Sequence, residues 1–274
     1  MMMRNNIMPK IDLLIMDIDD AFLYHRTVAA ANRIFLNTIA GFFGARIREK
    51  RLLTTADAFM KSLKVIFYNI HEFRFSKRGF RRFAILSGYA VLLHLLNAAR
   101  ELFNLLGGKM SNKAIIMAWA AAVKKARINE KEYSTDKEVI RKSLYDETKE
   151  VFDRIRRANR KMDIAAISEN FSLSTRKDPI IRLLDIGFMK SNTLICDKKG
   201  DITDYKISIA SRDDKKRVAQ AIIMKTKAKN IGIIIDDYDD LGLLGIDGLK
   251  LVVYAPKIER FIDKKRYCAI RVDV

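Results

Sequence analysis

The sequence predicts an α/β protein, with a mostly parallel, Rossmann-like layered sheet and a large all-α insert after the first strand. From residue 162 onward, short apolar runs alternate with amphipathic helical segments, which is typical of a parallel sheet covered by helices. One further apolar run, Asp12 to Met16, stands alone near the N-terminus and must join the same sheet. Between the two, residues 21–161 have helical spacing of apolar residues almost throughout.

The insert is predicted to be helical because its apolar residues recur every three or four positions. Leu92, Leu95 and Ala99 share one helical face, and no proline interrupts the chain between residues 9 and 179. The longest uncharged stretch, residues 83–99, contains polar side chains and is short for a membrane span. We therefore expect a buried helix there and no transmembrane segment.

The segments after the insert follow one another in the order that a layered sheet requires. Strands are expected at 162–168, 230–236, 249–255 and 267–272, and as a pair around a Lys-Gly turn within 192–210. Helices are expected at 178–188, 211–228 and 257–263. The predicted division is an α/β core formed by residues 1–20 and 162–274, and a helical domain formed by residues 21–161.

Composition and charge indicate a globular protein with one strongly basic segment. With 274 residues, of which 49% are hydrophobic, the chain is globular in composition and can bury a sizeable core. Two cysteines cannot make a disulfide framework, and the first ten residues lack a signal-peptide pattern, so we expect a reducing, cytoplasmic location. Of the net charge of +19, nearly all lies in residues 21–161, which hold 29 Lys+Arg and 12 Asp+Glu.

The polar residues that could act in catalysis or ligand binding follow the predicted strands or lie at the start of a predicted helix. In chain order they are Asp17 and Asp19, Ser168, Lys215, and Asp236 and Asp240. In open α/β sheets the ligand site lies outside the carboxyl ends of the strands, so these features would converge. Each feature alone also fits a solvated turn or helix end. A lysine near a helix start opposes the helix dipole, however, and a partner anion would explain it.

The order of these features resembles the haloacid dehalogenase-like (HAD) superfamily, in particular its phosphoserine-phosphatase-like branch. That family has Asp-x-Asp after an apolar strand, a Ser or Thr ending the next core strand, a Lys near a helix start, and a strand followed by acidic residues. The resemblance covers roughly residues 11–20 and 162–274. Many members of this family also have a helical insert, called a cap, between the first motif and the second strand.

The resemblance implies a Mg2+-dependent phosphatase that hydrolyses a phosphorylated small molecule, a phosphate monoester, through an aspartyl-phosphate intermediate. It implies that Asp17 is the nucleophile and that Asp19 is the general acid and base. It further implies that Ser168 and Lys215 bind the oxygens of the transferring phosphoryl group.

The implied metal site consists of carboxylates at the ends of the first and a later strand. Asp17, the backbone carbonyl of Asp19 and Asp236 would hold Mg2+, and Asp240 would support it directly or through water. The residue chemistry agrees, because Mg2+ prefers oxygen ligands and its charge offsets the repulsion between a carboxylate and a phosphate.

The sequence departs from the family pattern in places. Ala21 stands where the family usually has a Thr that orients the second Asp, and Ile235 stands where Gly is usual. Lys216 competes with Lys215 for the role of phosphate-site lysine. Phosphotransfer stays open as an alternative to hydrolysis.

The basic insert has three interpretations. It is a solvated surface, a cap that attracts an anionic substrate, or a surface that binds nucleic acid or an anionic membrane. The clusters at 46–51, 74–83 and 154–161 permit the third. Arg26, shortly after the first motif, is the candidate substrate-binding residue. The alternative function is therefore a non-enzymatic HAD-like protein that binds nucleic acid or membrane through this region.

Overall fold

A seven-stranded sheet forms the centre of the molecule. The computed structural model describes residues 8–18, 26–42, 55–69, 77–105, 112–134, 137–142, 144–175 and 178–273. The strands are β1 (Leu13–Met16), β2 (Asp163–Leu173), β3 (Phe188–Cys196), β4 (Ile202–Lys206), β5 (Ile231–Ile235), β6 (Leu249–Tyr254) and β7 (Cys268–Arg271). Their order is β4-β3-β2-β1-β5-β6-β7, and all neighbours are parallel except β3 and β4. The predicted mostly parallel α/β fold is confirmed.

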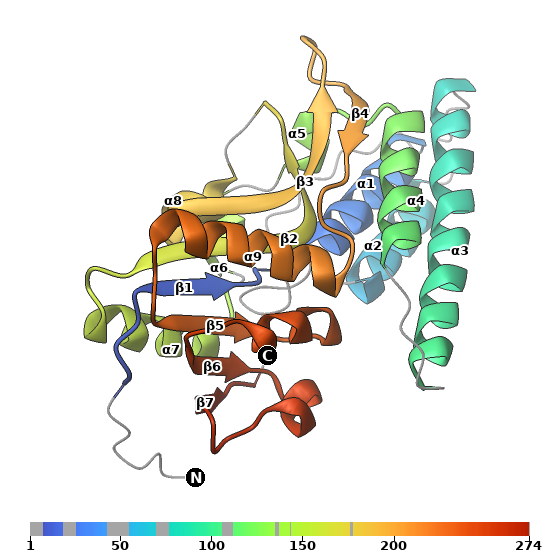
Figure 1. Cartoon of the computed structure of the whole chain (residues 1–274). Coiled ribbons are helices and arrows are strands. Elements are labelled where there is room, and N and C mark those ends of the chain that lie inside the picture. The colour runs from blue at the N-terminus through green and yellow to red at the C-terminus, as the bar shows by residue number, and fades with distance from the viewer. Residues whose placement is uncertain are drawn as a thin grey trace.

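Helices cover both faces of the sheet and form a separate group beyond it (Figure 1). The helices of the inserted segment are α1 (Arg26–Phe42), α2 (Thr55–Asn69), α3 (Lys77–Leu105), α4 (Lys113–Lys125), α5 (Glu130–Tyr133), α6 (Lys137–Lys142) and α7 (Asp146–Ala158). The later ones are α8 (Pro179–Leu183), α9 (Arg212–Thr226) and the 3-10 helices η2 (Tyr238–Gly245) and η3 (Pro256–Phe261). Among the described residues, no helix is long and apolar enough to cross a membrane.

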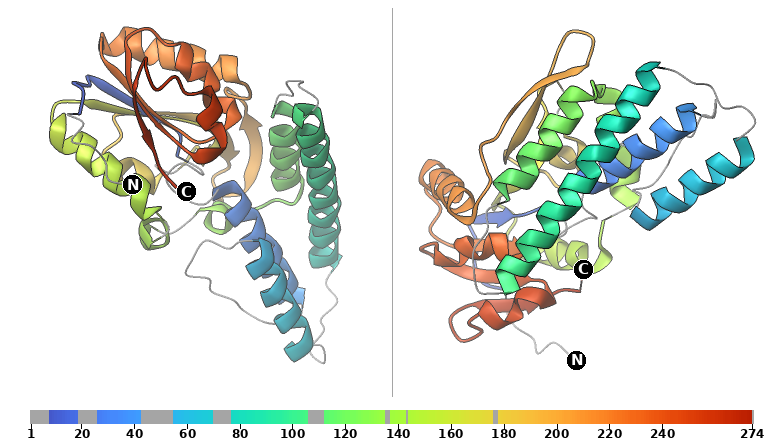
Figure 2. Two further views of the ribbon diagram at one scale, coloured as in Figure 1. Left: turned by 90° about the horizontal axis from the view of Figure 1, so that it is seen from below. Right: turned by 90° about the vertical axis from the view of Figure 1, so that its right-hand side faces the viewer.

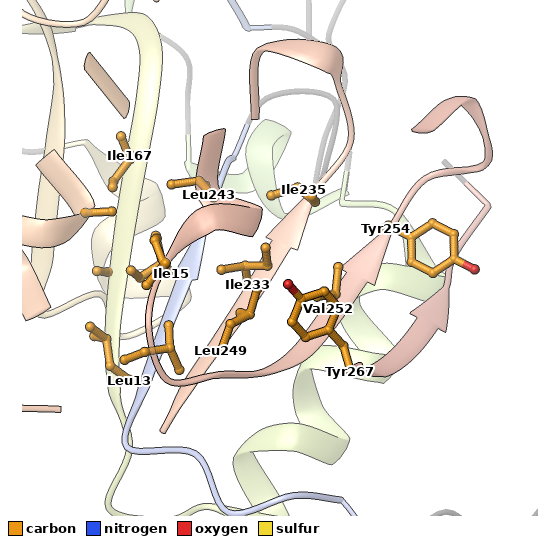
Figure 3. Packing of buried hydrophobic residues seen from close by; sticks show 14 of the residues in the cluster. Leu13, Ile15, Ile167, Ile233, Ile235, Leu243, Leu249, Val252, Tyr254 and Tyr267 are labelled. Atoms are coloured by element: carbon orange, nitrogen blue, oxygen red, sulfur yellow. The ribbon is translucent and has the colours of Figure 1, made fainter. Parts of the chain in front are cut away.

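The central strands are buried on both faces, which explains their continuous apolar sequences. Every residue of β1 and β5 is buried. Because successive side chains point to opposite faces, Leu14 and Met16 pack toward α7, whereas Leu13 and Ile15 pack toward α9. Figure 3 shows the second of these layers, in which Leu13 and Ile15 lie beside Ile233 of the neighbouring strand.

The last two helices of the inserted segment belong to the core layer. Ile140 of α6 and Val151, Phe152 and Ile155 of α7 pack in the same cluster as Leu14 of β1. Helices α1 to α4 lie to one side of the sheet in Figure 1 and in the left view of Figure 2, and α4 packs there in one hydrophobic cluster with Leu194 of β3 and Ile202 of β4. Two helices within the predicted helical domain of residues 21–161, α6 and α7, therefore pack directly on the sheet.

Strand β2 and helix α8 differ from the predicted segments. The strand does not stop at Ser168 but continues to Leu173, with a register shift against β3 between Ser168 and Phe171. The polar residues at this irregularity resemble a turn in the sequence, which explains the early predicted end. Helix α8 is shorter than predicted, because the chain from Phe188 already forms β3.

The buried side chain of Asn192 connects the sheet to the loop before α9. Its Nδ2 donates to the carbonyls of Glu169 at 2.5 Å and Ile209 at 2.8 Å. Its Oδ1 accepts from the backbone N–H groups of Ser208 at 2.8 Å and Ile209 at 3.0 Å. The amide therefore fixes the loop before α9 relative to the irregularity in the middle of β2.

Replacing Asn192 should destabilise the protein strongly. In Asn192→Leu, the backbone groups that the amide satisfies stay buried without partners, at a cost of about 1–3 kcal/mol for each group left unpaired. We expect the free energy of unfolding, measured with denaturant, to fall by at least about 3 kcal/mol. Thr203→Ala on β4 is the control, because Thr203 makes one exposed bond of 3.4 Å. Equal stability of the two variants would contradict this role.

Candidate active site

Asp17 lies at the carboxyl end of the central strand, where the chain leaves β1 between β2 and β5. Its N–H donates to the carbonyl of Ile234 at 3.1 Å, so its backbone still belongs to the sheet. Its Oδ1 accepts from the N–H of Ile18 at 2.7 Å, and its Oδ2 accepts from Lys215. The strand order reverses around β1, and such a switch point is where ligands bind in open α/β sheets.

Lys215 comes from the first turn of α9, which starts as predicted. Ser211 caps this helix by accepting the N–H of Asp214 at 3.2 Å. The ammonium of Lys215 is buried, 2.7 Å from Asp17 Oδ2 and 2.5 Å from Asp240 Oδ1. Burial lowers the pKa of a lysine, but the two carboxylates outweigh it and hold the pKa of Lys215 well above its ordinary value. The structure thus brings Lys215, not Lys216, to Asp17.

Asp240 is fully buried at the start of η2, and both its carboxylate oxygens have partners. Oδ1 accepts from Lys215, whereas Oδ2 accepts from the N–H groups of Asp236 at 3.3 Å and Asp237 at 3.4 Å. Asp237 in turn accepts the N–H of Tyr238 and begins the helix. The acidic residues after β5 therefore form a turn that is held by its own carboxylates.

Three buried carboxylates, those of Asp17, Asp236 and Asp240, have oxygens within 4.8 Å of one another. Burial, followed by the negative charges of Asp240 and Asp17, raises the pKa of Asp236 to about 9. Lys257 of η3 opposes this rise, with its Nζ 3.1 Å from Asp236 Oδ2. The two carboxylates that contact Lys215 outnumber its single positive charge, and all the donors of the cluster are hard oxygens. This site therefore fits a divalent cation such as Mg2+.

Ser168 lies on the strand next to Asp17. In the ladder, Met16 pairs with Ala166, so Ser168 extends two residues further along the same edge of the sheet. Its side chain is fully buried and its Oγ accepts the N–H of Asn170 at 3.1 Å. The irregularity of β2 after Ser168 turns the following backbone away from regular pairing with β3.

A hydrogen-bonded junction that the sequence analysis missed joins the helical group to the core. The Nδ2 of Asn112, the residue before α4, donates to Glu169 Oε2 at 2.8 Å and to Asp239 Oδ2 at 2.6 Å. Burial raises the pKa of Glu169 to about 7, against the opposing charge of Lys215. Lys257 was missed as well. No local pattern marks these residues, because they come together only through the packing of distant segments.

Two predicted site residues cannot be placed with the others. Asp19 lies outside the described residues. Arg26 begins α1, but its side chain is not among those that the structure describes.

No family model matches the sequence, and no curated protein matches it. Solved structures are similar in fold. Phosphoserine phosphatase in its apo form is 12% identical, with a TM-score of 0.50 over 97% of this chain and 94% of that one. A phospho-aspartyl intermediate analogue of phosphoserine phosphatase gives the same TM-score and identity over 97% and 95%.

A probable phosphoserine phosphatase from Vibrio cholerae is 15% identical, with a TM-score of 0.49 over 94% of this chain. The chain spans 59% of the length of that protein. At these identities the similarity concerns the fold, which has the seven-stranded, mostly parallel sheet described above. The chain therefore has a fold similar to that of phosphoserine phosphatase.

Proposed function

We propose that this protein is a Mg2+-dependent phosphatase that hydrolyses a phosphate monoester through an aspartyl-phosphate on Asp17. The observation that carries the proposal is the buried contact of Lys215 with Asp17 and Asp240 beside Asp236. A carboxylate at a strand end, a buried cation and an acidic oxygen cluster are the groups that phosphoryl transfer to a carboxylate requires. The fold of the phosphoserine phosphatases supports the same reaction class.

In this mechanism a carboxylate oxygen of Asp17 attacks phosphorus, and the bond from phosphorus to the leaving oxygen breaks. Lys215 holds Asp17 in place and offsets the negative charge that gathers on the phosphoryl oxygens. The family resemblance implies that Asp19 protonates the leaving oxygen. Water then attacks phosphorus, giving its proton to Asp19, and the bond to Asp17 breaks. Ser168 is the proposed second partner of the phosphoryl oxygens.

Asp17 and Asp236, with the backbone carbonyl of Asp19, are the proposed holders of Mg2+. The bound cation would neutralise charge on the carboxylates and on the phosphate. Asp240 is the proposed supporting ligand, directly or through water, because its carboxylate lies in the same buried cluster. It would also position Lys215 and the backbone of the acidic turn.

The substrate class is proposed to be a phosphorylated small molecule, because the site lies beneath a separate helical group. Asn112 brings α4 to two acidic core residues at this place, so the helical group has the position of a cap.

Cys196 and Cys268 are both free, which supports a reducing, cytoplasmic location.

Substitution of the nucleophile and its partner should separate the two chemical steps. Asp17→Asn removes the attacking charge with little change in shape, so turnover of an aryl phosphate should vanish while the protein stays folded. Asp19→Asn should slow turnover by roughly 10²–10⁴-fold and let the phosphoryl-enzyme accumulate. Mass spectrometry of acid-quenched Asp19→Asn should find the added phosphoryl group on the peptide that contains Asp17. Activity that survives in pure Asp17→Asn protein would refute the covalent mechanism.

The two lysines at the start of α9 should behave differently. Lys215→Met leaves two buried carboxylates without their cation, which should lower the free energy of unfolding by about 3–5 kcal/mol and abolish turnover. Lys216→Met is the matched control. Equal melting temperatures for the two variants in metal-free buffer would contradict the assignment of Lys215.

Metal binding should depend on Asp236 far more than on its neighbour. Asp236→Asn removes a buried carboxyl group that can ionise when a cation binds, so Mg2+ affinity measured by calorimetry should fall by at least about tenfold. Asp237→Asn is the control, since an asparagine keeps the cap of η2 and Asp237 is more exposed. If both variants bind Mg2+ as the unchanged protein does, the proposed metal site is wrong.

A further inference from the structure

Helix α3 presents apolar residues on two opposite sides. One side packs inside the helical group, where Leu86 is buried with residues of α4 and the ring of Phe83 stacks on Phe35 of α1 at 6.1 Å. The other side is exposed, although the sequence predicted a buried helix here. Val91 is 62% exposed, Leu92 41% and Leu95 64%. The apolar surface of α3 therefore exceeds what the fold itself buries.

The exposed apolar residues form one stripe along the helix. Ala84, Gly88, Val91, Leu95 and Ala99 are all exposed and follow one another at intervals of three or four residues. This spacing places them on one face over about 22 Å of helix. In Figure 1 and in the left view of Figure 2, α3 lies at the outer edge of the helical group, beside α4. An exposed apolar surface of this kind marks an interaction site.

The segment that carries this stripe is strongly basic. Residues 26–105, which contain α1, α2 and α3, hold 14 Lys+Arg and 4 Asp+Glu. Arg81 is exposed at the start of α3, close in sequence to the stripe. Arg81 precedes Ala84 by three residues, so a partner for this face meets positive charge at the start of the apolar stripe.

The apolar stripe and the positive charge are the two requirements that select the partner. A second copy would accept the apolar stripe but would bring a like-charged surface against it. A nucleic acid would accept the charge but offers no place to bury Val91 and Leu95. An anionic lipid surface satisfies both, with acidic headgroups for the cations and acyl chains for the stripe. We propose that the outer face of α3 docks the protein on an anionic membrane, with the helix lying in the plane of the interface.

Vesicle binding tests this proposal without any need for catalytic activity. The unchanged protein should co-sediment with phosphatidylcholine vesicles that contain phosphatidylglycerol, less so at high salt, and poorly with phosphatidylcholine alone. Leu95→Gln should weaken the binding by roughly tenfold, because one buried leucine is lost from the interface. Leu95→Glu should weaken it further. Leu95 is largely exposed, so both variants should melt at the temperature of the unchanged protein.

Met224→Glu on α9 is the matched control. Met224 is 74% exposed on a helix of the core, so this substitution adds the same charge at a similarly exposed apolar position away from α3. If the position of the substitution rather than the total charge determines binding, the affinity of Met224→Glu for vesicles should stay within about twofold of that of the unchanged protein. Equal losses in Met224→Glu and Leu95→Glu would overturn the proposal. A dimer in sedimentation velocity that Leu95→Glu dissociates, with no vesicle binding, would assign the face to a second copy instead.

Discussion

The contact of the buried Lys215 ammonium with Asp17 and Asp240 is the interaction on which the site depends. It links three parts of the sheet layer, the end of β1, the start of α9 and the turn after β5. None of these charged groups would be stable alone at this depth, because burying an isolated ion costs far more than a domain's net stability. The ammonium of Lys215 and the carboxylates of Asp17 and Asp240 therefore hold one another in place, because each is the opposite charge that keeps the other stable when buried.

This constraint extends outward through the backbone. Asp240 accepts the N–H groups that shape the acidic turn, and Asn192 fixes the loop from which α9 starts. The position of Lys215 is thus set from both ends, by its carboxylates and by the start of its helix. A group whose position is fixed before the substrate arrives needs no reorganisation during the reaction, which is the general source of electrostatic catalysis.

Much of this arrangement is readable from the sequence, for a physical reason. Central parallel strands such as β1 and β5 are buried on both faces and so appear as continuous apolar runs, and the residues that follow them share one edge. Other features leave no local pattern. The apolar face of α7 looks the same whether it packs on helices or on the sheet, and Asn112, Glu169 and Lys257 acquire their partners only in the folded chain.

The central place of β1 has a consequence for how the chain folds. Asp12, just before this strand, bonds Asn230, which lies 218 residues further along the chain. Strand β1 pairs with β5 and with β2, and β2 follows only after the whole inserted segment. During synthesis β1 therefore leaves the ribosome before both its partner strands, with its apolar residues uncovered. Such long-range pairing is slow and prone to aggregation, so the nascent chain should depend on chaperones until β5 emerges.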